Sequence, residues 1–502
     1  GGQIAPAGKT GMRPAPGAFQ RSAIQSRPNA MATEIVLFNT LGRKLETFQP
    51  LVPGEARLYV CGPTVYNEVH IGNLRSFMFR DILGRSLRYL GYRVTQVMNL
   101  TDVDDKTING AQKAGVSLDE YTAPFIESFL RDLDVLHIER ADIFPRATQH
   151  IPEMIDIIRT LVEKGFAYET DGSVFFSIAR DDDYGRLSGY DLEQARQGDR
   201  VASDEYGKED VRDFVLWKAV KPGEPSWDSP WGPGRPGWHI ECSAMSMKYL
   251  GETFDFHLGG VDLIFPHHEN EIAQSESATG KPFVRHWLHS EHLIVDGQKM
   301  SKSLGNQYTL ADLLARGSSP RALRYLFLSV HYRQKLNFTF DSLEGAVGAL
   351  RRVDEMRFRL GHAQEKGEPN AGIAEIAGRL RHDFAAALAD DLNLAAALAS
   401  VFALVKEVNV AIEEGRIGTG DRLRILDALA DVDQVLGVLD PAAWPEGQAK
   451  DDDAEEIERL IAERNDARKN RDFAASDRIR DELTARGIVL EDTPQGTRWK
   501  RR

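Results

Sequence analysis

Residues 57–100 contain the pattern that most restricts the fold of this chain: a short apolar run, a helical pattern and a second apolar run. "RLYVC" (57–61) and "YRVTQVMNL" (92–100) are typical of buried strands. Between them the apolar residues lie near one helical face, with Asn73 as the expected N-cap and Gly91 as the expected helix stop. This close succession predicts a βαβ unit and therefore a parallel sheet, which makes the fold class α/β.

Further along, the pattern predicts several domains, because 502 residues exceed what one hydrophobic core supports. Residues 166–236 mix short strands with a Pro/Gly/Trp-rich run and read as an insertion that splits the sheet domain. "FDFHLGG" (254–260) and "WLHSEHLIVDG" (287–297) are expected to resume the sheet. From about 320 to 440 the pattern is helical, the acidic run 451–456 is expected to be a linker, and a compact ending follows.

Composition restricts the cellular compartment and the kinds of partner that we expect for this chain. Two cysteines argue against a disulfide scaffold and for a reducing compartment, so we expect a cytoplasmic protein. No apolar run approaches the roughly 18 residues of a membrane span, so no membrane partner is expected. Residues 1–33 are basic and rich in Gly and Pro, and we interpret them as a disordered leader or an expression remnant. The net charge of −14 requires any nucleic-acid partner to be held by a local basic surface, for which "RWKRR" (498–502) is the candidate.

Two segments have the composition of phosphate-binding loops. His70, Gly72 and Asn73 lie where the first strand meets its helix, and a helix N-terminus with a nearby imidazole suits a phosphate. "GQKMSKSLGN" (297–306) carries Lys299 and Lys302 between glycines, as the transfer of phosphoryl or nucleotidyl groups requires mobile cations. Taken singly, either segment could be an ordinary loop.

Both cysteines fall in polar, motif-like segments, which suggests a metal site. Cys61 ends the first strand and Cys242 lies in "GWHIECSAMS". In "FPHHENEIAQS", His267 and Glu271 are i and i+4 on one helical face. Two thiolates, an imidazole and a carboxylate make a plausible zinc site, although any one of them alone could be an ordinary core residue.

Taken together, these motifs resemble a known family. "CGPTVYNEVHIGNLR", "NLTDVDDK", "GWHIECSAM", "FDFHLGGVDLIFPHHENEIAQS" and "GQKMSKSLGN" are similar to the motifs of cysteinyl-tRNA synthetases, which are class I aminoacyl-tRNA synthetases. The "KMSKS" signature is complete, whereas "HIGH" reads HIGN here, with Asn73 in place of the second histidine.

The resemblance implies a Rossmann-type catalytic domain with an insertion, a helical bundle and a small anticodon-binding domain. The expected ranges are 34–145 and 237–320 for the catalytic halves, 146–236 for the insertion, 321–450 for the bundle and 451–502 for the anticodon-binding domain.

The resemblance also assigns roles to residues. The implied zinc ligands are Cys61, Cys242, His267 and Glu271, and the implied catalytic residues are His70, Asn73, Lys299 and Lys302. ATP is expected to contact His70, Gly72, Asn73, Gly259, Gly260, Asp262 and Lys302, and cysteine to contact Thr64, Trp238 and His257. Asp102, Asp104 and Asp105 are interpreted as a solvated acidic loop without a catalytic role.

The implied activity is that of a monomeric cysteine–tRNA ligase with the partners L-cysteine, ATP and tRNA-Cys and the cofactors Zn²⁺ and ATP-bound Mg²⁺. Zinc would select the substrate thiol over a hydroxyl, which a shaped pocket distinguishes by only about 100-fold. Two alternatives remain at this point: a ligase that joins cysteine to the amine of a sugar, and a non-catalytic tRNA-binding paralogue. The chain beyond about 320 argues against the first, and the intact "KMSKS" argues against the second.

Overall fold

A four-stranded parallel sheet forms the centre of the computed structural model, which describes residues 34–189, 213–301, 303–445, 454–470, 472–493 and 496–501. Its strands are β3 (Glu55–Val60), β4 (Arg93–Met98), β9 (Phe254–Gly260) and β10 (Val284–Ser290), in the order β10-β9-β3-β4. All neighbouring strands are parallel, and α1 (Ile71–Tyr89) connects β3 to β4. The predicted βαβ unit and the α/β class are confirmed, and the leader at 1–33 lies outside the described residues.

The sheet separates two hydrophobic cores, because successive side chains of a strand point to opposite faces. On β3, Leu58 and Val60 belong to the core that α1 covers, whereas Tyr59 belongs to the other core. This second core continues into the insertion, where Phe176 and Trp217 are fully buried. The insertion therefore packs on the sheet and does not form a separate core.

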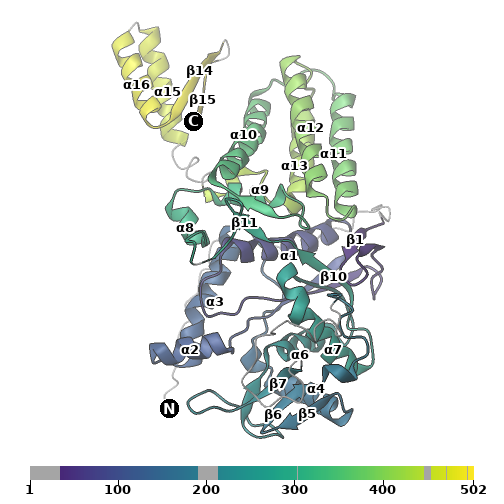
Figure 1. Ribbon diagram of the computed structural model, residues 1–502. Helices are drawn as coiled ribbons and strands as arrows, with labels where there is room; N and C mark the ends of the chain where they lie inside the picture. Colours follow the sequence, from purple (N-terminus) through teal and green to yellow (C-terminus); the bar gives the residue numbers. More distant parts are fainter. Residues whose placement is uncertain are drawn as a thin grey trace, which may run out of the picture.

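The insertion contains an antiparallel sheet of order β5-β6-β7-β8, seen in the lower part of Figure 1. Its strands are β5 (Ala167–Thr170), β6 (Ser173–Phe176), β7 (Phe214–Ala219) and β8 (Gly234–Pro236). The helices of this region are α4 (Ile151–Glu163), α6 (Trp238–Leu250) and α7 (Glu269–Thr279), while α2 (Asp105–Ala114) and α3 (Leu118–Val135) follow β4.

A smaller sheet carries the segment 297–306. It consists of β11 (Leu293–Val295), β12 (Gln298–Lys299) and β13 (Leu336–Phe338), in the order β12-β11-β13. The prediction that 254–260 and 287–297 resume the central sheet is confirmed for β9 and for residues 287–290 of β10, and it is wrong for 293–295, which form β11 of the smaller sheet. The chain leaves the central sheet after Ser290, turns at Glu291 and His292, and starts a strand of another sheet, because Leu293 pairs with Leu336 of β13.

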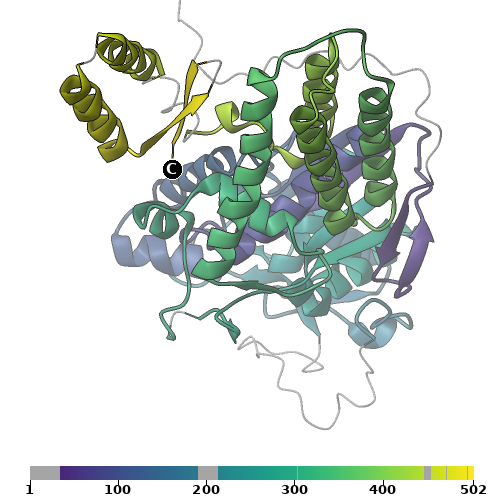
Figure 2. The same ribbon diagram turned by 90° about the horizontal axis from the view of Figure 1, so that it is seen from above.

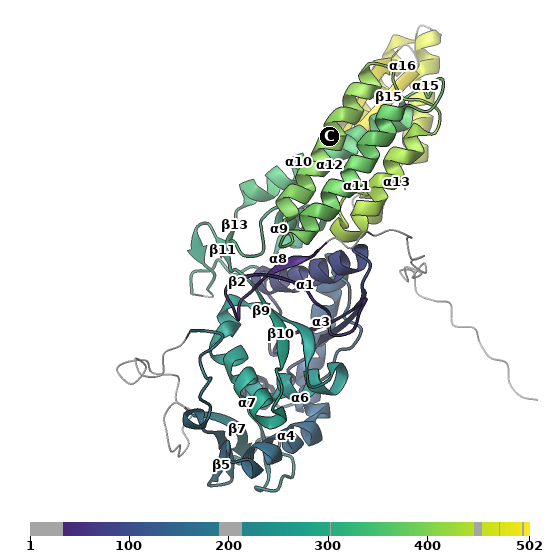
Figure 3. The ribbon, with the colours of Figure 1, turned by 90° about the vertical axis from the view of Figure 1, so that its right-hand side faces the viewer.

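Helices follow from residue 310 onward, as predicted for about 320–440. They are α8 (Leu310–Ala315), α9 (Pro320–Leu328), α10 (Phe340–His362), α11 (Ala371–Ala389), α12 (Leu394–Glu413) and α13 (Asp421–Leu436). Figure 3 shows α10–α13 as a bundle above the catalytic half. By length and composition α12 could cross a membrane, but its residues Val401, Leu404 and Val408 are buried in the bundle core.

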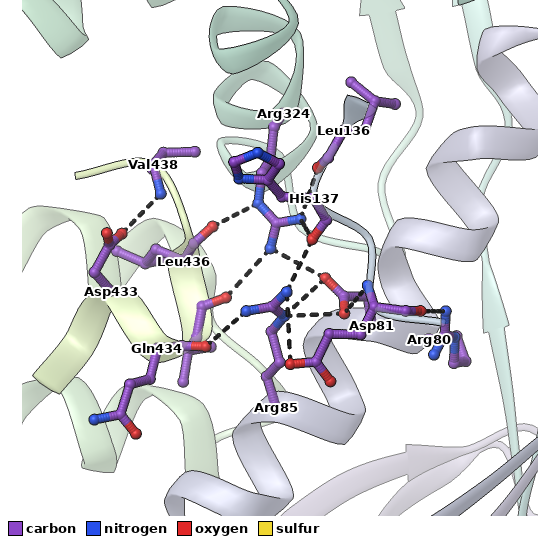
Figure 4. Close-up of polar contacts among 12 residues, drawn as sticks. Arg80, Asp81, Arg85, Leu136, His137, Arg324, Asp433, Gln434, Leu436 and Val438 are labelled. Carbon is purple, nitrogen blue, oxygen red and sulfur yellow. Dashed lines mark hydrogen bonds and ion pairs between the residues drawn. The ribbon is translucent and has the colours of Figure 1, made fainter. Parts of the chain in front are cut away.

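A buried ionic network joins the bundle to the central sheet (Figure 4). The guanidinium of Arg324 on α9 donates to the carbonyl oxygens of Leu436 at 2.7 Å and His137 at 2.8 Å. It also donates to Asp81 of α1 at 3.0 Å, and Asp81 accepts from Arg85 at 2.9 Å. Arg324 and Asp81 are fully buried, so this network fixes α9 and the end of α13 against α1.

The C-terminal unit stands apart from the bundle in Figures 1 and 2. It contains α15 (Ala454–Lys469), α16 (Phe473–Ala485) and the antiparallel hairpin of β14 (Ile488–Thr493) with β15 (Gly496–Arg501). The linker prediction for 451–456 is wrong for 454–456, which begin α15, and 451–453 lie outside the described residues. Acidic residues favour a helix N-terminus, and Glu456 lies 3.1 Å from Arg486 of α16.

Candidate active site

The sequence motifs meet at the carboxyl ends of β3 and β9, the edge at which parallel sheets bind their ligands. Cys61 follows β3 directly, and Gly259 and Gly260 end β9 beside it. Because α1 starts at Ile71, its N-terminus also faces this edge. The backbone at Gly62 lies so close to Asn99 that an added Cβ would overlap the Asn99 carbonyl group.

Four elements bring the predicted metal ligands together. The Sγ atoms of Cys61 and Cys242, the latter on α6, lie 3.7 Å apart. Oε1 of Glu271 on α7 lies 3.8 Å from Cys61 Sγ and 3.0 Å from His267 Nε2. All but Cys61 are buried to within 1% of their surface, so their geometry is fixed by packing.

His268 is a member of this cluster that the sequence analysis missed. Its Nε2 lies 3.4 Å from Cys61 Sγ and 3.9 Å from Glu271 Oε1. The ligand atoms of Cys61, His267, His268 and Glu271 all lie within 4.8 Å of one another. The adjacent histidines of "FPHHENE" were the available signal, but helical spacing alone favoured His267.

The cluster fits a zinc ion by its donor chemistry. Nε2 of His267 is buried and lies 3.0 Å from Glu271 Oε1, so this nitrogen faces into the cluster. The other ring nitrogen of His267, Nδ1, lies 2.9 Å from His239 Nδ1, and such outer contacts commonly orient a ligand histidine.

The pKa values divide the cluster into two charged acceptors and two protonated groups. Burial raises the pKa of Cys61 well above its ordinary value. Burial alone would lower the pKa of His267, but Glu271 and Cys242 raise it to about 10, so a metal would displace protons from these two residues. Burial alone would raise the pKa of Cys242, but hydrogen bonds with Cys61 and His267 lower it to about 6. Burial alone would likewise raise the pKa of Glu271, but His257 and His267 lower it to about 2. A thiolate and a carboxylate are thus available at neutral pH, the forms in which these groups bind metals.

The residues expected to contact cysteine lie around this cluster in different ways. The ring of Trp238 stacks on His267 at 4.1 Å and is 37% exposed, so it can form a wall of the pocket. Thr64 is half-buried and is bridged to Thr101 at the sheet edge. His257 is fully buried, and its Nε2 contacts Glu271 Oε2 at 2.9 Å. It therefore lies behind Glu271 and supports the carboxylate.

A further histidine pair extends the polar network below the cluster. Nδ1 of His268 lies 2.8 Å from Nε2 of His289 on β10, and Nδ1 of His289 lies 2.8 Å from Thr40 Oγ1. No periodic pattern predicts His289, because the pairing of β10 with β9 brings it opposite Gly259, over which His268 packs.

His70 is the N-cap of α1, so the prediction of Asn73 as the N-cap is wrong. Nδ1 of His70 accepts from the backbone N–H groups of Gly72 at 3.1 Å and Asn73 at 3.2 Å. Asn73 is the third residue of the helix, and its Oδ1 accepts from the His70 N–H at 3.2 Å, which closes a capping box. Because Nδ1 is an acceptor, the neutral ring carries its proton on Nε2, where it can serve as a donor.

Burial favours that neutral form, since it lowers the pKa of His70 although Asp262 opposes the shift. Asp262 lies just beyond β9, in the short turn 261–263. The side chain of His268 packs over Gly259 at the end of this strand. A Cβ on Gly259 would lie 2.6 Å from His268 Cε1, so this position accepts only glycine without movement.

The segment 297–306 lies against the start of α1. The Met300 methyl group covers Gly72, where an added Cβ would lie 2.5 Å from it. Asn306 Oδ1 accepts from the Ser301 N–H at 2.9 Å, and the chain returns to α1 through Ile71 N–H, which donates to Tyr308 O at 2.9 Å. Lys299 is exposed at the edge of β12, and Lys302 lies outside the described residues.

The acidic loop after β4 has structural partners, which corrects its interpretation as solvated. Asp102 is 3% exposed and accepts from the Thr148 hydroxyl at 2.7 Å. Asp104 caps α2, and Asp105 pairs with Lys218 of β7 at 2.9 Å. Asp102 and Asp105 thus attach the insertion to the segment that follows β4.

At the chain end, the alternation in "GIVLEDTPQGTRW" (487–499) predicts a strand and a turn. β14 confirms the strand and pairs with β15, whereas residues 494–495 between them lie outside the described residues. Trp499 is half-buried in the small core of this unit, and its Nε1 donates to Glu458 Oε1 at 2.6 Å. The indole is therefore engaged within the unit, which argues against a frayed tail at this position; Arg502 lies outside the described residues.

Comparisons with known families agree with this arrangement. The chain matches the model of the class I (C) tRNA synthetase catalytic domain over residues 47–348. It also matches the DALR domain over 383–440 and the cysteinyl-tRNA ligase anticodon binding domain over 450–499.

Curated relatives are similar along nearly the whole chain. A cysteine–tRNA ligase of Solibacter usitatus is 50% identical over 465 residues, which cover 93% of this chain and 99% of the relative. A cysteine–tRNA ligase of Chlamydia pneumoniae is 49% identical over 474 residues, which cover 93% of this chain and 98% of the relative.

Solved structures show the same fold at low identity. Mycobacterium tuberculosis methionyl-tRNA synthetase in complex with methionyl-adenylate superposes with a TM-score of 0.55 at 16% identity, over 77% of this chain and 90% of that one. The ternary complex of Agrobacterium radiobacter K84 LeuRS with tRNA gives 0.54 at 14% identity, over 80% and 86%.

Proposed function

Since this chain belongs to the cysteine–tRNA ligase family of class I aminoacyl-tRNA synthetases, we propose that it joins L-cysteine to tRNA-Cys in two steps. In the first, the carboxylate of cysteine attacks the α-phosphorus of ATP, and pyrophosphate leaves. In the second, a hydroxyl of the 3′-terminal ribose of the tRNA, the 2′-hydroxyl if class I behaviour holds, attacks the carbonyl carbon of the adenylate, and AMP leaves.

One observation carries the assignment of the substrate: two free thiols, an imidazole and a carboxylate converge at the end of β3, next to the start of α1. Cys61, Cys242, His267 and Glu271 would hold one zinc ion. The ligand atoms that lie within 4.8 Å of one another are those of Cys61, His267, His268 and Glu271, and Cys242 adjoins this group at 3.7 Å from Cys61 Sγ. A bound zinc ion would favour the substrate thiolate over the hydroxyl of serine. Trp238 would then limit the space left for the side chain.

The phosphate end of the site lies at the start of α1. The positive end of the helix dipole suits the α-phosphate, and the Nε2–H of His70 is a donor for its oxygens. The backbone N–H groups of Gly72 and Asn73 are engaged by His70 Nδ1. Asn73 occupies the place of the second histidine of the signature, but its side-chain oxygen is engaged in the capping box. The donors left for the departing pyrophosphate are Lys299 and Lys302, with Mg²⁺ bound to ATP.

The nucleoside would lie beside the end of β9, near Gly259 and Gly260, whose missing side chains let His268 and Asp262 approach the strand end. Asp262 would accept hydrogen bonds from the ribose hydroxyls. The full-length match to curated ligases, with an anticodon binding domain at 450–499, disfavours both the sugar ligase and the non-catalytic paralogue.

The test is cysteine-dependent exchange of labelled pyrophosphate into ATP, followed by charging of tRNA. We expect exchange with cysteine and background exchange with serine, and charging of tRNA-Cys alone from total tRNA. Equal exchange with both amino acids would contradict the role of the thiol-binding cluster.

We further propose that the enzyme acts as a monomer in the cytoplasm. Cys61 and Cys242 are free thiols, and a reducing compartment keeps them available for a metal. Light scattering of the purified protein should give the mass of one 56.1 kDa chain, and a mass of two chains would contradict this proposal.

A further inference from the structure

Arg75 is a buried cation whose role the site described above does not explain. It lies on α1, five residues after His70, and is only 4% exposed. Its guanidinium donates to four backbone carbonyl groups that are more than two hundred residues away in the sequence. Nη1 binds Glu291 O at 2.6 Å and His292 O at 2.8 Å, and Nη2 binds Gln334 O at 2.5 Å and His331 O at 3.3 Å.

The four carbonyl groups belong to two turns that precede the strands of the small sheet. The turn 291–292 leads into β11, and the turn 331–334 leads into β13. The two turns are also tied to each other, because Glu291 N–H donates to Tyr332 O at 2.8 Å and Leu336 N–H donates to His292 O at 3.1 Å. Figures 1 and 3 show β11 next to α1.

This small sheet carries the 297–306 segment. β11 pairs with β12, which contains Lys299, and the loop then crosses α1 with Met300 over Gly72. One guanidinium thus connects the helix that begins at the phosphate site with both strands that support the lysine loop. A shift of either turn would move the loop relative to His70.

The bonding of Arg75 differs from that of Arg324, another arginine that binds several carbonyl groups. Arg324 also pairs with the carboxylate of Asp81 at 3.0 Å. Within the part of the chain that the structure describes, Arg75 forms no ion pair, and its charge is balanced by carbonyl dipoles. The guanidinium is a rigid planar fork, so partners on both of its terminal nitrogens fix its position and its plane.

We propose that Arg75 is a positioning residue for adenylate formation. It holds the 297–306 loop at a fixed distance from the start of α1. This inference rests on the proposed function. The loop lysines must reach the departing pyrophosphate in the transition state, and a misplacement of about 1 Å can cost on the order of 100-fold in rate. The guanidinium is required because each of its two terminal nitrogens serves a different turn.

Arg75→Lys is the variant that tests this role. An ammonium group keeps the charge but offers a single nitrogen, which cannot bind both turns in the same geometry. We expect kcat for cysteine-dependent ATP–pyrophosphate exchange to fall about 30-fold or more. KM for cysteine should stay within about 3-fold, and the zinc content should not change. Both follow because Arg75 does not contact the cluster of Cys61, Cys242, His267 and Glu271.

Arg80→Lys is the matched control. Arg80 lies on the same helix, is fully buried, and binds Gln96 Oε1 at 2.8 Å and the carbonyl group of Glu139, far from both turns. It should lower the melting temperature as much as Arg75→Lys does while leaving kcat within about 3-fold. If both variants lose kcat equally, Arg75 is an ordinary core residue and the proposal is wrong.

A second measurement follows the loop directly. Trypsin should cleave after Lys299 or Lys302 faster in Arg75→Lys than in Arg80→Lys at temperatures where both are folded. Equal cleavage rates would overturn the proposal. If Arg75→Lys does not fold, Arg75→Gln, which keeps donors for one turn, is measured in the same way.

The two proposals fail differently. If the wild-type protein shows no cysteine-dependent exchange, the proposed function is contradicted. The comparison of trypsin cleavage rates then still tests whether Arg75 positions the 297–306 loop. A wild-type protein with exchange and an Arg75→Lys variant with unchanged kcat contradicts the positioning role alone.

Discussion

The thiol cluster and the C-terminal unit are built on opposite principles. The cluster takes Cys61, Cys242, His267 and Glu271 from four elements spread over more than two hundred residues, and the packing of the whole catalytic half holds them. The C-terminal unit has its own small core from two helices and a hairpin, whose buried members are Ile457, Leu460, Ile461, Leu483 and Ile488. A small local core folds with few outside contacts, so this unit can be altered without disturbing activation.

The bundle lies between these extremes. It has a large core of its own, but the network of Asp81, Arg85 and Arg324 attaches it to α1. The comparison thus predicts that substitutions near the cluster affect cysteine activation, that the network affects stability, and that the C-terminal unit affects tRNA alone.

The largest effect is expected from Cys242→Ser. Loss of one thiolate should remove zinc and cysteine binding together and lower cysteine-dependent exchange by at least about 1,000-fold, or about 4 kcal/mol. Zinc content, exchange rate and melting temperature should be measured on the same preparation. Ser246→Ala, on the same helix, is the control and should keep its metal. A metal-free Cys242→Ser protein with full affinity for cysteine would contradict the role of the cluster.

The ionic network gives the next effect. Burial alone would raise the pKa of Asp81, but Arg85 and Arg324 lower it to about 2. Because the pKa is lower in the folded protein, the ion pairs stabilise it above the ordinary pKa of 3.8, and this stabilisation is lost as the pH falls from about 4 to about 2.

Asp81→Asn should therefore destabilise the protein by about 3 kcal/mol at pH 7, because it leaves the fully buried Arg324 without its carboxylate and leaves Arg85 with Glu139 alone. Its stability should also depend less on pH between 4 and 2 than that of the wild type. Urea unfolding at several pH values measures both effects. An unchanged free energy of unfolding at pH 7 would show that the network does not hold the bundle.

A smaller effect, confined to catalysis, is expected from Lys302→Ala. The rate of pyrophosphate exchange should fall about 100-fold while cysteine affinity and zinc content stay unchanged, because the lysine acts on the departing pyrophosphate. Lys281→Ala, an exposed lysine paired with Glu252, is the control. An unchanged exchange rate would mean that the loop plays no part in the chemistry.

The smallest effect should follow deletion of residues 451–502. Exchange should stay within about 2-fold, because all residues of the cluster and the phosphate site precede 310. The KM for tRNA in charging should rise about 10-fold, in line with the roughly 1–3 kcal/mol of a single base contact. If the truncated protein charges tRNA as well as the full chain at physiological salt, this unit is not a tRNA-binding element.

The sequence alone determined the local features of this protein. The βαβ unit, the helical spacing of His267 and Glu271, and the hairpin after Gly487 follow from patterns within a few tens of residues. The choice of cysteine as substrate also follows from sequence, because the two cysteines fall in motifs of a known family.

Only the tertiary structure decided which side chains support these motifs. His268, His257 and His289 join the cluster because α7 lies over the ends of β9 and β10, and the capping role of His70 depends on the backbone angle at which the chain enters α1. Arg75 read as one charged residue in a helical pattern, yet its partners are carbonyl groups of two distant turns. Backbone carbonyl groups are the same in every residue, so no pattern of side chains reveals which of them a buried cation will bind; the packing of α1 against the small sheet decides it.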